Sequence, residues 1–191
     1  KGKYVLDALY NNETNEISFI YSKVRQGKIL HEALHHVFKT KNMFGTLEEV
    51  TALTQEHISG VIDGLEKLLS NEWTIDDFLN ILDAASFEVK QTVKDVFYVG
   101  YNRLDWQIRE FIENLSYAIK SDTEIFANFY SNTAPLAGFM SMIKADTNDE
   151  STDTIFDRYL NQILKVTDNE QLKGTLAKLY NDKVNEQFKN F

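Results

Sequence analysis

The stretch from residue 29 to residue 38 contains the pattern His-Glu-x-x-His, in a chain that has only four histidines. On an α-helix, residues four apart lie on one face, so His31 and His35 can present ring nitrogens to one metal ion. Zinc peptidases use this arrangement, in which two imidazoles and a third protein ligand bind Zn²⁺ and a water occupies an open position. The intervening glutamate, here Glu32, then accepts a proton from that water as it attacks a carbonyl group.

The residues around the pattern are those of a helix with one buried face. Apolar side chains recur at helical spacing and form a single stripe: Ile29, Leu30, Ala33, Leu34, Val37 and Phe38. An amphipathic helix with incidental histidines at the edge of its stripe has the same pattern, because the motif fixes only three residue types. His36 points about 100° away from His35 around the helix, which favours a surface or supporting role over metal binding.

A third ligand is expected on a second helix further along the chain. Glu49 is the first choice, because a helix that turns back at Gly45 can lay its first turn against the motif helix. Glu48, Glu56 and His57 remain alternatives. Glu49 also has a competing role, since Thr46 with a glutamate three residues later is the pattern of a capping box at a helix start.

The run from Glu16 to Leu69 resembles a known group of proteins. A short strand, the segment Leu30 to His36 and the segment Glu48 to Leu53 are similar to small HExxH metallopeptidase-like proteins of phages and mobile elements, related to the ImmA/IrrE group. That group has a later helix opening in Glu-x-x-Ala, which Glu49 and Ala52 match. The resemblance implies a gluzincin-like zinc site with His31, His35 and Glu49 as ligands, Glu32 as general base and a regulatory protein as substrate. It covers about a third of the chain.

Composition bounds the remaining possibilities. The 191 residues carry 20 basic and 29 acidic side chains, a formal charge of −9 that disfavours binding to nucleic acid. The chain has no cysteine, which excludes disulfides, thiolate zinc sites and cysteine nucleophiles. No apolar run approaches the roughly 18 residues needed to cross a bilayer, so we expect no membrane association, with a cytoplasmic location slightly favoured.

The fold class predicted is mainly α, with an N-terminal β-hairpin followed by a multi-helix bundle. One proline and eight glycines leave long uninterrupted segments, which favour helices. The hairpin is expected over Tyr4 to Tyr10 and Glu16 to Tyr21, around the turn-forming residues 11–15. Helices are expected through the motif to about Lys41, from Thr46 to near Ser70, after Thr74, from Ser86 past Leu115, after Ser121, near Pro135, over 155–164 and over 172–188.

Two further patterns occur in the helices expected after Ser86. Ser121 with Glu124 repeats the capping-box pattern. Tyr98, Tyr101 and Trp106 fall at core spacing on the long helix expected after Ser86, and they are interpreted as packing residues. Residues 1–71 are expected to form a zincin-like unit of a hairpin and two helices, and residues 72–191 a helical extension packed on it as one compact unit.

Two functions follow from these observations. The first is a zinc-dependent, peptidase-like hydrolase in which metal-activated water attacks a carbonyl of a protein or peptide substrate, with Glu32 as base. The alternative is a noncatalytic helical module for protein binding or assembly, whose HExxH pattern is incidental or degenerate. Its support is residues 72–191, which hold aromatic and aliphatic stripes but no cluster that carries chemistry.

Overall fold

The computed structural model describes residues 8–11, 13, 16–19, 26–40, 42–131, 135–146 and 152–167. Within these ranges the chain is mainly α-helical, as the sequence predicts. The helix expected over 172–188 and the outer ends of the two expected strands lie outside the described residues. No helix among those described has the length and apolar character needed to span a bilayer.

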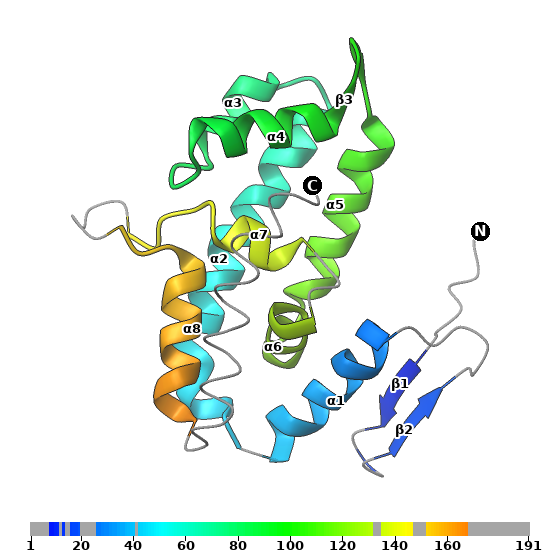
Figure 1. Cartoon of the computed structure of the whole chain (residues 1–191), viewed down its shortest axis with the longest axis vertical. Coiled ribbons are helices and arrows are strands. Elements are labelled where there is room, and N and C mark those ends of the chain that lie inside the picture. Colours follow the sequence, from blue (N-terminus) through cyan, green and yellow to red (C-terminus); the bar gives the residue numbers. More distant parts are fainter. Residues whose placement is uncertain are drawn as a thin grey trace.

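Two short strands precede the motif helix. β1 (Ala8–Asn11) and β2 (Glu16–Phe19) pair antiparallel, with Ala8 opposite Phe19 and Asn11 opposite Glu16. The helix that follows, α1 (Gln26–Thr40), carries the HExxH pattern and packs against β1. In Figure 1 this pair and α1 occupy the end of the molecule opposite α3 and α4.

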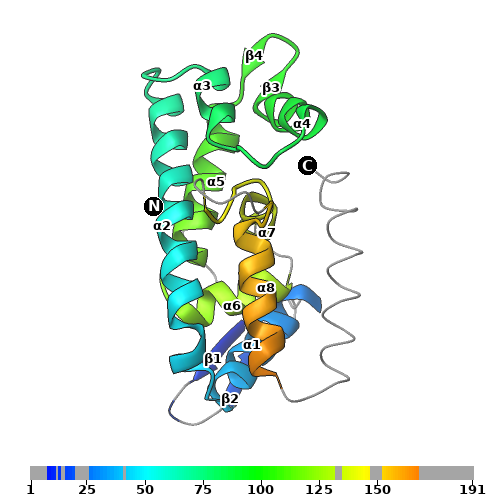
Figure 2. The same ribbon diagram turned by 90° about the vertical axis from the view of Figure 1, so that its left-hand side faces the viewer.

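The longest helix, α2 (Phe44–Leu69), forms the axis of the remaining fold. It packs against α8 (Ile155–Val166) and α5 (Asp105–Ala118), which lie along it in both views (Figures 1 and 2). The shorter helices are α3 (Ile75–Asn80), α4 (Phe87–Phe97), α6 (Asp122–Ser131) and α7 (Leu136–Met140). Buried residues recur along α2 every three or four positions, which is why this helix has a core-facing stripe: Leu47, Thr51, Thr54, Ile58, Val61, Leu65 and Leu68.

Aromatic side chains fill much of the core. Phe78 contacts Phe97 and Phe139, and Phe111 contacts the same two rings, with centroid separations of 5.6–6.5 Å. These edge-on and tilted contacts are the geometries that aromatic pairs prefer. One continuous apolar cluster joins this group to Phe38 of α1, so the motif helix is anchored to the same core as the later helices.

The long helix predicted after Ser86 is wrong, because a hairpin interrupts it. α4 ends at Phe97, β3 (Tyr98–Val99) pairs antiparallel with β4 (Asn102–Arg103), and α5 begins only at Asp105. Gly100, in the turn between β3 and β4, has a φ of +65°, a left-handed conformation that glycine adopts readily and that suits a tight turn. The hairpin projects from the end of the molecule in Figure 1. Tyr101 is therefore fully exposed instead of buried, and Trp106 is also largely exposed.

The starts of α3 and α4 have the caps that the sequence predicts, whereas the start of α2 does not. Thr74 and Asp77 form a complete capping box at α3, and Ser86 accepts a hydrogen bond from the Val89 amide at α4. The box predicted for Thr46 and Glu49 is wrong: α2 begins earlier, at Phe44, and the Thr46 hydroxyl donates to the Met43 carbonyl. Glu49 therefore lies inside α2, in its second turn, where it is exposed to solvent and does not cap the helix.

Candidate metal centre

Helix α1 brings the two motif histidines together on its inner face. His31 and His35 stand one turn apart, their Nε2 atoms are 3.2 Å from each other, and their rings meet nearly edge to face. His31 is 7% exposed, and the His35 side chain is 12% exposed. Helical spacing alone predicts this convergence, and the packing of α1 against α6 removes both rings from most of the solvent.

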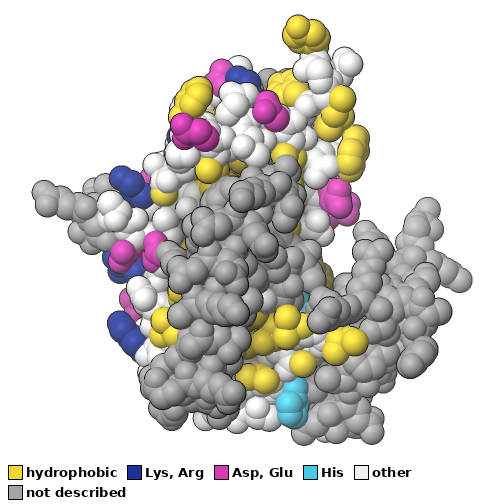
Figure 3. All heavy atoms as spheres, viewed as in Figure 1, with side chains coloured by type: hydrophobic (Ala, Val, Ile, Leu, Met, Phe, Trp, Pro, Cys, Tyr) yellow, Lys and Arg dark blue, Asp and Glu magenta, His cyan; other side chains and the backbone are white. Residues whose placement is uncertain are grey.

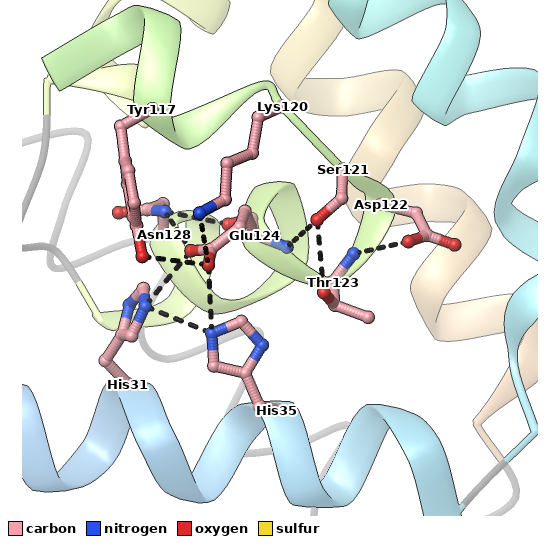
Figure 4. A network of polar contacts seen from close by, with 9 residues as sticks. All are labelled: His31, His35, Tyr117, Lys120, Ser121, Asp122, Thr123, Glu124 and Asn128. Carbon is pink, nitrogen blue, oxygen red and sulfur yellow. Dashed lines mark hydrogen bonds and ion pairs between the residues drawn. The ribbon is translucent and has the colours of Figure 1, made fainter. Parts of the chain in front are cut away.

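Helix α6 supplies a carboxylate to the same point. Glu124 is 7% exposed, and its Oε2 lies 3.2 Å from His31 Nε2 while its Oε1 lies 3.6 Å from His35 Nε2. Figure 4 shows the carboxylate of α6 pointing down onto the two rings of α1. Across the part of the chain that the structure describes, these three residues form the group whose possible metal-binding atoms lie within 4.8 Å of one another.

The spacing of these atoms fits a zinc ion. Zinc–nitrogen and zinc–oxygen bonds of about 2.0–2.2 Å in a tetrahedral site place neighbouring ligand atoms about 3.3–3.6 Å apart. The two histidine Nε2 atoms are 3.2 Å apart, Oε2 of Glu124 is 3.2 Å from His31 Nε2, and the other carboxylate oxygen, Oε1, is 3.6 Å from His35 Nε2. Two imidazoles and one carboxylate are also a donor set that zinc accepts, with a fourth position left for water.

Several polar groups surround the Glu124 carboxylate. The Tyr117 hydroxyl donates to Oε1 at 3.0 Å, and Lys120 Nζ lies 3.6 Å from the same oxygen and 3.8 Å from the centre of the Tyr117 ring. Asn128 Nδ2 donates to the Glu124 main-chain carbonyl at 2.8 Å and reaches Oε2 at 3.4 Å. The carboxylate is therefore held from both sides (Figure 4).

These contacts fix the ionisation of the site. Burial disfavours the charged form of Glu124, but hydrogen bonds and attraction from His31 and His35 outweigh it and hold the pKa of Glu124 well below its usual range. Burial, the charge of Glu124 and the charge of Glu32 raise the pKa of Tyr117 far above its ordinary value. At neutral pH the site therefore contains a carboxylate anion and a neutral phenol that donates to it.

The residues singled out from the sequence fall in different places. Glu32 follows His31 on α1, is partly buried, and is near enough to Tyr117 for its charge to act there. Glu48 and Glu49 are exposed on α2 and are not members of the convergent group, in which Glu124 takes the third position.

The two remaining alternatives lie apart from the histidine pair. Glu56 and His57 line a separate pocket on α2 with Ile143 and Lys144. The Nδ1 atom of His57 is 2.9 Å from the Leu53 carbonyl, so the ring is held against its own helix.

Sequence reasoning missed Glu124 because its local pattern has a simpler explanation. Ser121 does cap α6, since its hydroxyl accepts a hydrogen bond from the Glu124 amide at 3.3 Å. The other half of the predicted box, the side chain of Glu124, instead lies with the histidines. The one available signal is that Glu124 directly precedes Ile125 and Phe126 in the first turn of α6. Both of these apolar residues are buried, so this turn must pack against the core.

The buried group of two histidines and one glutamate is consistent with a zincin-like site. No protein-family model, curated protein or solved structure matches this chain.

Proposed function

We propose that His31, His35 and Glu124 bind a divalent transition metal, with Zn²⁺ as the best match, and that the protein is a zinc-dependent hydrolase of proteins or peptides. The observation that carries the proposal is the convergence of two imidazole nitrogens and a carboxylate at 3.2–3.6 Å on a largely buried face. The HExxH order adds the glutamate that such hydrolases use as a base.

Each residue of the site has a distinct task in this proposal. A bound zinc ion would act as a Lewis acid and lower the pKa of the water bound to it to near neutrality. Glu32 accepts the proton from the attacking water and passes it to the leaving amine. Glu124 supplies the negative charge that balances the ion, and its low pKa keeps it ionised at neutral pH. The helical core that holds α1 against α6 keeps the ligands in register.

The noncatalytic alternative has an observation of its own. Three large apolar side chains are well exposed on or beside the projecting hairpin, Val99, Tyr101 and Trp106, and hydrophobic side chains are visible at this end of the molecule in Figure 3. Exposed apolar groups gathered at one end of a protein often mark a contact with a partner. Under this alternative the His31–His35–Glu124 contacts serve only to join α1 to α6.

Zinc binding by the purified protein, residues 1–191, separates these functions. We expect one zinc per chain by inductively coupled plasma mass spectrometry, and a loss of affinity of about 100-fold or more in Glu124→Gln, which keeps the shape of the side chain but removes its charge. Glu49→Gln is the matched control and should bind as the parent does, because Glu49 is exposed on α2. Loss in Glu49→Gln and retention in Glu124→Gln would instead support the ligand set implied by the family resemblance. A parent protein that takes up no zinc, even after zinc is added, would contradict the hydrolase.

A further inference from the structure

We infer that Tyr117 is a positioning residue for the metal: with help from Lys120 it holds Oε1 of Glu124, so that the carboxylate binds through Oε2 alone. The inference rests on the proposed function. It concerns how many ligand atoms Glu124 supplies and therefore how much of the coordination shell stays open.

The two carboxylate oxygens of Glu124 have different surroundings. Oε1 accepts the Tyr117 hydroxyl at 3.0 Å and has Lys120 Nζ and His35 Nε2 at 3.6 Å. Oε2 has His31 Nε2 at 3.2 Å and only a long contact, 3.4 Å, to Asn128 Nδ2. Oε2 is therefore the oxygen closer to an imidazole nitrogen and the one less engaged by other donors.

Tyr117 is the stronger of the two groups that engage Oε1. Its hydroxyl donates at a good hydrogen-bond distance, and hydrogen bonds to a charged acceptor are stronger than those to a neutral one. The Lys120 side chain is half exposed and more distant, so solvent screens much of its attraction. The ammonium group of Lys120 instead lies over the Tyr117 ring at 3.8 Å, which helps to hold the ring in place.

The number of oxygens that bind decides whether a hydrolytic site is open. Catalytic zinc sites have three protein ligand atoms and keep a further position for water or substrate. If both oxygens of Glu124 bound the ion, the carboxylate would take up that further position. A donor fixed on Oε1 opposes this second bond, as groups hydrogen-bonded to ligating carboxylates do in other metal sites.

Cobalt(II) provides a direct test, because its visible absorption is intense in a four-coordinate site and weak when the coordination number rises. We expect the parent protein to give the intense spectrum. Tyr117→Phe should bind Co²⁺ about 10–100-fold more weakly and give a weaker band at saturating metal. Lys120→Met should have a smaller effect on both readouts.

Tyr101→Phe is the control, since Tyr101 is fully exposed on the distant hairpin and should bind Co²⁺ like the parent. A loss of stability in metal-free Tyr117→Phe does not obscure the result, because the spectrum is measured on metal-bound protein. An unchanged affinity and spectrum in Tyr117→Phe would overturn the inference while the metal site stands. Failure of the parent protein to bind Co²⁺ would overturn both.

Discussion

Glu32 and Glu124 lie close to the same histidines, yet their surroundings differ. Glu124 is buried and faces both imidazoles, whereas Glu32 is only partly buried and follows His31 on the same turn. The proposed roles differ accordingly, with Glu124 as a metal ligand and Glu32 as a general base. Binding and catalysis should therefore respond differently when each side chain is changed.

The first prediction concerns Glu32→Gln. The variant should retain one zinc per chain, because the ligands are untouched, but cleave peptides about 10²–10⁴-fold more slowly, which is the usual contribution of a general base. Mass spectrometry of a peptide mixture incubated with parent and variant measures the rate. Equal cleavage by the two proteins would exclude Glu32 as the base, while loss of zinc from the variant would make it a ligand.

The second prediction concerns acid stability of the metal-free protein. Contacts with His31 and His35 lower the pKa of Glu124 in the folded state, so its contribution to folding is present above the pKa of about 4.3 of an unfolded glutamate. That contribution is lost progressively as the pH falls below this value toward the lower folded pKa. Urea unfolding between pH 7 and pH 3 should show a smaller loss of stability in Glu124→Gln than in the parent. Parallel pH profiles would contradict the role of Glu124.

At the scale of elements, the β3–β4 hairpin is tied to the end of α2 through Arg103. Its Nη1 donates to the Leu68 carbonyl at 2.8 Å and to Asn71 Oδ1 at 2.7 Å, and its Nε contacts Asp105 at 2.7 Å. The last carbonyls of a helix lack intrahelical partners and carry partial negative charge, so a guanidinium group satisfies them well.

The third prediction follows from this contact. Arg103→Ala should lower the free energy of unfolding by about 1–3 kcal/mol, because it removes the side-chain donor from the part-buried Leu68 carbonyl at the end of α2. Arg109→Ala provides the comparison, since Arg109 is exposed on α5 and its removal should change stability by less than about 0.5 kcal/mol. Urea denaturation measures both. A value for Arg103→Ala as small as that for Arg109→Ala would mean that solvent replaces these bonds without loss.

The elements also show which parts of the fold local sequence encodes. The histidine pair on α1 follows from helical spacing, and the caps at Thr74 and Ser86 from nearby residues. The hairpin was missed because apolar residues continue at helical spacing across it, whereas the conformation of Gly100 decides the chain path. Glu124 was missed for a different reason. The packing of α6 on α1 is a long-range contact, and the local pattern around Ser121 accounts for a glutamate at that position without it.

At the scale of the whole molecule, metal binding should increase the free energy of unfolding. A ligand that binds only the folded state adds about 2.7 kcal/mol at a concentration 100 times its dissociation constant. Zinc should therefore raise the midpoint of thermal unfolding of the parent protein, and a chelator should reverse the effect. Glu124→Gln should show neither change. Stabilisation of the variant equal to that of the parent would place zinc at a different site.

The separation of the ligands along the chain has a consequence for protein synthesis. His31 and His35 leave the ribosome long before Glu124, and the three groups meet only when α6 packs on α1. Bringing both ends of a loop of about 90 residues together in an unordered chain costs about 4–5 kcal/mol. A nascent chain that has not yet exposed residue 124 holds two ligands at most. If the three residues bind metal as proposed, full-affinity uptake is thus confined to chains in which α1 and α6 have both been translated and have packed together.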